Sequence, residues 1–277
     1  MQKPARALAP SEIAIDVTGC LLDPRDAFLM RDPVPGTRFE FVPGRHAAGR
    51  VMATGPEATN LSGRPVLVPE LLPCGSCAAC RRALPLHCPD LVRPGVTHDG
   101  GLAEQLVVPS RYVIPLDGAL SWKGPLGDAA LCGCFALPYQ AVAVAGLSAG
   151  DVALAPPEDE ALCQLLRAKG ARAPGPDAPS VGWRIFAAAA VPAGPLPPGS
   201  TLVLYGDRGP DPLPTDAARA AEAQIRFVRG CHPDLYPELL AMMIRGEIGL
   251  EVERLPFARA AEGLTRCAAG PVLVLRD

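Results

Sequence analysis

The chain has 277 residues and a formal net charge of −3, with 49% apolar and 20% charged residues. This apolar share can build a sizeable core, and the length suits two modest domains or one large one. The longest basic run is Arg81-Arg82, so the sequence lacks the concentrated basic face that nucleic-acid binding needs.

The N-terminal segment has no apolar core of a secretory signal, and nowhere do about 18 apolar residues follow one another. Four of the 10 cysteines are clustered and the others are scattered. This distribution is typical of metal binding in a reducing compartment rather than of a disulfide framework. We therefore expect a cytoplasmic protein with no membrane segment.

The first part of the chain predicts short strands. Residues 12–19 alternate between apolar and polar side chains, as a half-buried strand does. Residues 47–55, 63–72 and 101–109 are further candidates, with Gly or Pro marking the turns. Several short strands separated by turn residues predict a barrel-like β domain.

From about Pro138 the pattern changes to helices that alternate with buried strands. The predicted helices cover residues 138–147, 158–171, 233–249 and 257–270, and the predicted strands cover 151–155, 183–190, 200–206 and 271–275. This alternation predicts a parallel α/β unit.

The segment "CGSCAACRRALPLHC", residues 74–88, has the spacing C-x₂-C-x₂-C-x₇-C. Four thiolates at this spacing can enclose one tetrahedral Zn²⁺, with Zn–S bonds of about 2.3 Å. Because four sulfurs leave no position for water or substrate, we expect one structural zinc per chain. Its ligands would be Cys74, Cys77, Cys80 and Cys88; the alternative is a set of reduced, unligated cysteines.

The cysteine segment, its distance from the N-terminus and the following "HDGGLAEQLVVP" resemble the zinc-containing medium-chain dehydrogenases, which are alcohol dehydrogenase-like. "VTGC", "GRHAAGRVMATG" and "PYQAV" extend this resemblance over nearly the whole chain. Within the family, "GRPVLVPELLPCGSCAAC" and "GCHPDLYPELL" are most similar to the 6-hydroxycyclohex-1-ene-1-carbonyl-CoA dehydrogenases.

The resemblance implies a GroES-like β-barrel domain with the structural zinc lobe at residues 1–137. It implies a Rossmann-like parallel α/β domain, shortened here, at residues 138–240. A C-terminal helix and strand at residues 241–277 would return to the first domain. The family also implies an NAD(P) cofactor and a second, catalytic zinc.

The three catalytic zinc ligands of the family fall on Asp23, Arg45 and Gly133, and the Glu of its Gly-His-Glu segment falls on His46. An open catalytic site needs three protein ligands. Arg45 would instead place a fixed positive charge against a dication. We therefore expect an Asp23–Arg45 ion pair to fill this site.

Other residues near these positions leave an alternative open. Cys20 lies close to the first ligand position, and Cys132 and Cys134 flank the third. A shift of one residue would let Cys132 or Cys134 join Asp23 and His46 around a metal. The plain interpretation is that these cysteines are buried, inert thiols.

The dinucleotide site also departs from the family. Where the family has a Gly-rich turn before a helix, this chain has "PPEDEALCQ", residues 156–164, whose prolines remove N–H donors and whose acidic residues oppose a pyrophosphate. Twelve residues separate Gly170 from Trp183, against the roughly thirty that a Rossmann unit needs. We therefore expect no ordinary NAD(P) binding.

Our leading hypothesis is a degenerate, non-redox pseudoenzyme of this family. It would form a homodimer, or a heterodimer with a full-length paralogue, through residues 201–206 as an edge strand. The alternative is an enzyme that acts on a cyclic or aromatic acyl-CoA, or a related carbonyl substrate. It would use Asp23, Asp26, Arg45, His46, Cys132 and Cys134 as acid, base or nucleophile, or keep residual zinc-dependent oxidoreductase activity. A third reading keeps a dehydrogenase that binds its cofactor in a shortened mode.

Overall fold

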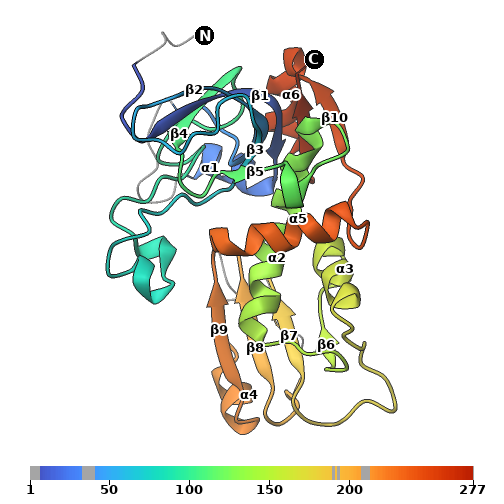
Figure 1. The fold of residues 1–277 in the computed structure, drawn as a ribbon. Coiled ribbons are helices and arrows are strands. Elements are labelled where there is room, and N and C mark those ends of the chain that lie inside the picture. Colours follow the sequence, from blue (N-terminus) through green and yellow to red (C-terminus); the bar gives the residue numbers. More distant parts are fainter. Residues whose placement is uncertain (1–6, 33–40, 189–190, 192–193, 207–212, 277) are drawn as a thin grey trace. The chain divides into compact units, whose positions relative to one another are not determined.

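The computed structural model describes residues 7–32, 41–188, 191, 194–206 and 213–276 (Figure 1). The chain divides into two compact units. The first unit contains Met1–Gly133, His232–Ile244 and Glu251–Asp277, and the second contains Cys134–Cys231 and Arg245–Leu250. The chain therefore returns twice to its first unit after leaving it at Gly133.

Strand β1 (Glu12–Leu22) organises the sheet of the first unit. Its burial alternates along residues 12–18, as the sequence predicts. Its first half pairs with β4 (Gln105–Pro109), its second half pairs with β11 (Val272–Leu275), and β2 (His46–Thr54) runs antiparallel along its length. The sheet order is β10-β11-β1-β2-β3-β5, with β4 also on β1. The remaining strands are β3 (Pro65–Val68), β5 (Ile114–Pro115) and β10 (Glu253–Pro256).

The faces of this sheet bury two apolar clusters. One is built on the first half of β1, with Ile13 and Ile15 fully buried against β2, β3 and β4. The other joins the end of β1 to β11 and contains Leu22 and Val274. Three helices belong to this unit: α1 (Pro24–Arg31), α5 (Tyr236–Ile244) and α6 (Ala260–Arg266).

The second unit contains a four-stranded parallel sheet in the order β6-β7-β8-β9. Its strands are β6 (Ala153–Leu154), β7 (Arg184–Ala187), β8 (Thr201–Tyr205) and β9 (Gln224–Val228). Helix α3 (Glu160–Ala168) follows β6, and α4 (Thr215–Ala220) connects β8 to β9. The predicted parallel α/β unit is therefore confirmed.

Within the part of the chain that the structure describes, the outer side of β6 carries a single bridge. Val152, just before β6, pairs with β7 through its carbonyl group, which accepts from the N–H of Arg184. On its other side, one parallel bridge joins Val152 to Arg172. The short connection between Gly170 and Trp183 therefore leaves one bridge where a further strand of a full Rossmann sheet would lie.

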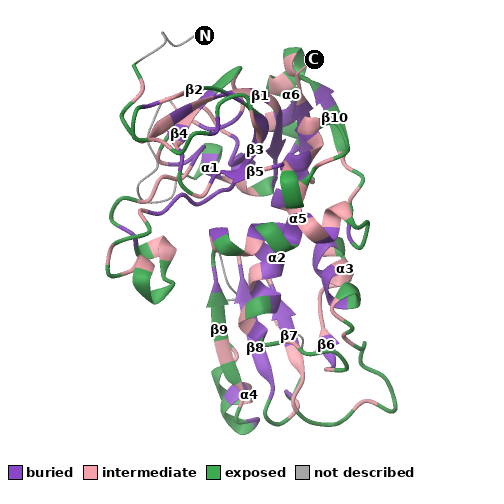
Figure 2. Ribbon diagram, viewed as in Figure 1, coloured by how far each residue is buried: buried purple, intermediate pink, exposed green. Residues whose placement is uncertain are grey.

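The prediction that residues 201–206 form a sheet edge is wrong. All five residues of β8 are buried between β7 and β9. The last strand of the order is β9, which is mostly exposed (Figure 2). Strand β9 was not predicted, because its five residues of mixed polarity, QIRFV, carry little strand signal.

Helix α2 (Cys132–Ala145) starts six residues before its predicted start, with Pro138 inside it. Together with the preceding 3₁₀ turn it forms an apolar stretch, Leu126–Ala145, that is long enough to cross a membrane by length and composition. However, 72% of its most apolar 18-residue window is buried inside the protein. Such burial is typical of a core helix.

Candidate functional sites

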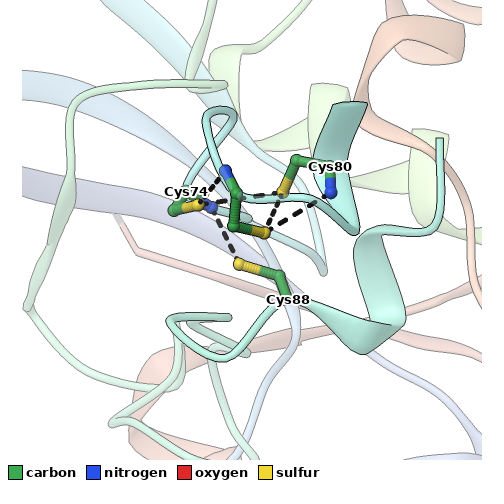
Figure 3. Close-up of side chains that lie close together, drawn as sticks. Cys74, Cys80 and Cys88 are labelled. Carbon is green, nitrogen blue, oxygen red and sulfur yellow. Dashed lines mark hydrogen bonds between the residues drawn. The ribbon is translucent and has the colours of Figure 1, made fainter. Parts of the chain in front are cut away.

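The cysteine lobe, residues 74–88, brings its four predicted ligands together. The Sγ atoms of Cys74, Cys77, Cys80 and Cys88 all lie within 4.8 Å of one another. Sulfur pairs are 3.5 Å apart for Cys77–Cys80 and 3.9 Å apart for Cys74–Cys80. A tetrahedron of Zn–S bonds has edges of about 3.8 Å. The three labelled cysteines converge on one point in Figure 3, and the cluster suits a structural zinc.

The backbone of the lobe donates hydrogen bonds to these sulfurs. The N–H of Cys77 lies 3.2 Å from the Cys74 sulfur, and the N–H of Cys74 lies 3.2 Å from the Cys88 sulfur. Hydrogen bonds from the backbone of Ser76 and Cys77 lower the pKa of Cys74 to about 6. Because such donors favour the charged form, the local fold favours a thiolate at Cys74, which is the metal-binding state.

Two arginines, one inside the lobe and one outside it, donate to backbone carbonyls of the lobe. Arg81 donates to the carbonyl of Ser76, and Arg111 donates to the carbonyl of Cys74. Tyr112, at a positive φ of 63°, lies beside Gly75, where an added Cβ would come 3.0 Å from the tyrosine hydroxyl. Arg111 was not predicted, because nothing in the sequence links it to Cys74, a residue 37 positions earlier.

The predicted Asp23–Arg45 ion pair forms, with Arg45 Nη2 2.6 Å from Asp23 Oδ1. It is part of a larger buried ionic cluster, which we define as Asp23, Arg25, Asp26, Arg45 and Glu70. Arg45 also lies 3.4 Å from Asp26 and 3.6 Å from Glu70. Arg25 forms ion pairs with two of these carboxylates, Asp23 at 2.8 Å and Glu70 at 3.0 Å.

Strand register explains how this cluster assembles. Leu21 on β1 is opposite His46 on β2, and Ala47 is opposite Val68 on β3. Two residues beyond that last pair, Arg45 and Glu70 come opposite each other at the strand ends. Asp23 follows β1 directly and begins α1 with a capping box, which places its carboxylate at the same edge of the sheet.

Burial and charge set the protonation of this cluster. Burial alone would raise the pKa of Asp23, but the guanidiniums of Arg25 and Arg45 outweigh it and hold that pKa well below its usual range. For Asp26, burial dominates over the attraction of Arg45 and raises the pKa. Asp23 therefore stays ionised, whereas Asp26 holds a proton more readily than a free carboxyl group does.

His46 lies beside the ionic cluster but bonds elsewhere. Its Nε2 is 2.8 Å from the hydroxyl of Tyr236, and both residues are buried. Burial lowers the pKa of His46 to about 4, so its imidazole is neutral at pH 7. A Cβ added to Gly133 would lie 2.5 Å from Nδ1 of His46. The His46 ring thus occupies the space that a ligand side chain at position 133 would need.

The remaining candidates do not complete a metal site. Cys20 and Cys132 are buried, and burial raises the pKa of Cys20 well above its ordinary value. Cys134 is half-buried and belongs to the second unit. Across the described part of the chain, only the cysteine lobe brings three or more potential metal ligands together. Asp23, Arg45, His46 and Gly133 therefore do not fit an open catalytic zinc site.

The turn after β6 holds a carboxylate of the chain itself. Asp159 is the N-cap of α3, and its Oδ1 accepts from the N–H of Leu162 at 2.9 Å. The hydroxyl of Tyr205, at the end of β8, donates to Oδ2 at 2.5 Å. Burial and the nearby Asp159 raise the pKa of Tyr205, so the hydroxyl keeps its proton. The helix N-terminus is thus already paired with an anion.

Comparisons with known proteins agree with the first unit. Residues 9–118 match the family model "Alcohol dehydrogenase GroES-like domain". Scyllo-inosose 3-dehydrogenase of Thermotoga maritima is 32% identical over 37% of this chain and 30% of its own length. D-altritol 5-dehydrogenase of Agrobacterium fabrum is 35% identical over 38% of this chain and 32% of its own length. Each match thus spans about a third of the length of the curated relative.

The fold comparison covers nearly the whole chain. A cobalt- and zinc-bound thermostable alcohol dehydrogenase from Pyrobaculum aerophilum superposes with a TM-score of 0.81. The superposition covers 98% of this chain and 93% of that chain, at 20% identity. Residues 9–118 therefore match the GroES-like domain of the alcohol dehydrogenases, and the chain as a whole has an alcohol dehydrogenase fold.

Proposed function

We propose that this chain is a non-redox, cytoplasmic member of the alcohol dehydrogenase family that has lost NAD(P) binding and serves as a protein subunit. The observation that carries the proposal is the Asp159 carboxylate at the N-terminus of α3. In a dinucleotide-binding unit this helix end holds a pyrophosphate. Here Asp159 and Tyr205 already form a closed pair there.

Charge and topology both oppose a dinucleotide at this turn. A pyrophosphate would have to displace the Asp159 side chain while Glu158 and Glu160 add further negative charge. Among the described residues, the outer side of β6 offers the Val152–Arg172 bridge and no strand that would present an acidic residue to a ribose. Both features support the loss of hydride-transfer chemistry, which needs a bound cofactor.

Calorimetric titration of the full chain with NAD⁺ and with NADP⁺ tests the proposal. We expect no saturable heat at millimolar cofactor, with a full-length dehydrogenase as the positive control. Binding with a micromolar dissociation constant would contradict the proposal. An Asp159→Gly variant separates the two causes. If it binds the cofactor, the Asp159 carboxylate prevents binding in the wild-type chain; if it does not, the shortened sheet is the cause.

The subunit part of the proposal rests on β9. Its outer backbone edge has no strand partner within the described residues, and Phe227 on it is 63% exposed. An open edge of this kind favours pairing with another strand, either from a second copy or from a full-length paralogue. Light scattering after size-exclusion chromatography should give a dimer mass, which Phe227→Lys should reduce and Met52→Lys, in the first unit, should not. A monomer at high concentration with no co-purifying partner would contradict this part.

The alternative function, chemistry on an acyl-CoA or related carbonyl substrate, has less support from the geometry. The carboxyl groups of Asp23 and Asp26 are both engaged by Arg45. His46 is only 1% exposed and is engaged by Tyr236. A general acid or base must reach the proton that it transfers. The finer similarity to 6-hydroxycyclohex-1-ene-1-carbonyl-CoA dehydrogenases stays a prediction.

A further inference from the structure

The guanidinium of Arg45 is enclosed as a coordinated cation would be. Its three nitrogens face three different carboxylates: Nη2 faces Asp23 at 2.6 Å, Nε faces Asp26 at 3.4 Å, and Nη1 faces Glu70 at 3.6 Å. Arg45 is 3% exposed, and the three acidic residues are 9% exposed or less. Solvent therefore contributes little to the balance of charge around this group.

We call the three carboxylates around Arg45, those of Asp23, Asp26 and Glu70, the cage. Other contacts also hold these carboxylates in place. Asp23 and Asp26 close the capping box of α1, with the N–H of Asp23 donating to Asp26 Oδ2 at 3.0 Å. Arg25 bridges Asp23 and Glu70 from the other side. These contacts position the three carboxylates around a planar guanidinium, whose N–H donors point in fixed directions.

The sequence positions of these residues relate the cage to the catalytic zinc site of the resembled family. Asp23, Arg45 and Gly133 fall where the resembled family has its catalytic zinc ligands, and the donors present do not suit that metal. Arg45 cannot donate an electron pair, Gly133 has no side chain, and the Nε2 of His46 is paired with Tyr236. A cluster of three buried carboxylates still requires compensating positive charge.

We propose that Arg45 is the built-in cation of this site: its guanidinium takes the place of the second metal ion of the fold and keeps divalent metals out. This inference does not depend on the loss of NAD(P) binding, since it concerns only the residues around Arg45. It states that the wild-type chain holds one zinc, in the cysteine lobe, and that the cage around Arg45 accepts a guanidinium.

Metal analysis of the wild-type chain is the first test. The protein is saturated with Zn²⁺, desalted and analysed, and we expect one zinc per chain.

The second test uses Arg45→Ala, which leaves a cavity inside the three-carboxylate cage. We expect its melting temperature to fall by roughly 10 °C, since removing one partner of a buried ion pair is strongly destabilising. Millimolar methylguanidinium should restore a large part of that loss.

A matched control is Arg64→Ala, which removes a guanidinium 2.5 Å from Asp117 at a half-exposed site. Methylguanidinium should leave its melting temperature unchanged, and Mn²⁺ or Zn²⁺ should not replace methylguanidinium in Arg45→Ala. If Arg45→Ala folds only when methylguanidinium is present, that result also supports the proposal. A second zinc in the wild-type chain, or an Arg45→Ala variant indifferent to methylguanidinium, would overturn it. Titration with NAD⁺ reports on the proposed function separately.

Discussion

The cysteine lobe and the buried ionic cluster lie in the same unit, and both fall on segments where the resembled family binds zinc. The lobe consists of four like donors whose sulfurs are all within 4.8 Å of one another. The ionic cluster combines three carboxylates with two guanidiniums of its own. One cluster needs an external cation, whereas the other contains its cations already.

The difference teaches what keeps a metal position functional. In the lobe, backbone N–H groups point at the sulfurs, and at Cys74 they lower the pKa and favour the thiolate. In the ionic cluster, the guanidiniums of Arg25 and Arg45 offset two of the three negative charges that would attract a metal. Substitutions that exchange these properties should therefore have effects of different kinds in the two clusters.

The largest effect is expected from Cys80→Ser. Loss of one thiolate should reduce bound zinc from about one per chain to near zero. It should also lower the free energy of unfolding by about 4 kcal/mol, as mass action gives for a metal at about 1,000 times its dissociation constant. Metal analysis and urea unfolding measure both. Cys163→Ser, in the second unit, is the control. Equal zinc loss in both variants would contradict the assignment of the zinc to the cysteine lobe.

The next effect concerns His46 beside the ionic cluster. Its pKa is about 4 in the folded chain, below the ordinary 6.5, so the unfolded chain binds more protons between these values. The contribution of His46 is therefore complete above pH 6.5 and falls as the pH falls toward 4, by roughly 3 kcal/mol in total. The raised pKa of Asp26 acts in the opposite direction, so a comparison with a variant is needed.

In His46→Gln this pH-dependent loss should disappear, because glutamine can meet Tyr236 without titrating. Urea unfolding of both chains at several pH values between 4 and 7 measures the difference. His87→Gln replaces an exposed histidine and should keep the wild-type profile. Parallel profiles for the wild-type chain and His46→Gln would mean that folding does not change the pKa of His46.

The two clusters also differ in how far the sequence predicts them. The lobe is local: its four ligands lie within 15 residues, so their spacing alone fixes the site. The ionic cluster joins residues 23–26 to Arg45 and Glu70 through the register of β1, β2 and β3. The sequence predicted the Asp23–Arg45 pair through a family resemblance, but Arg25, Glu70 and Tyr236 had no signal.

The fold shows the same division. Long alternating segments such as β1 and amphipathic ones such as α3 were predictable, because their own side chains carry the period. Short elements were missed, among them β9 and the eight-residue α1. The capping box of Asp23 and Asp26 was a usable signal for α1, but the few buried residues of that helix gave no clear helical period.

The smallest effect is expected at the rim of the lobe. A zinc bound by four thiolates gives a site with a net charge of −2. Arg81 and Arg111 each donate to a backbone carbonyl of the loop that carries the four cysteines. Groups outside the ligand shell typically change metal affinity by about tenfold or more. Arg111→Met should therefore release zinc to a chelator several-fold faster while the loaded chain still holds one zinc. Arg82→Met is the matched control, because the exposed Arg82 makes no side-chain hydrogen bond within the described residues. Equal release rates for the two variants would mean that the ligands and their backbone donors hold the metal without help from Arg111.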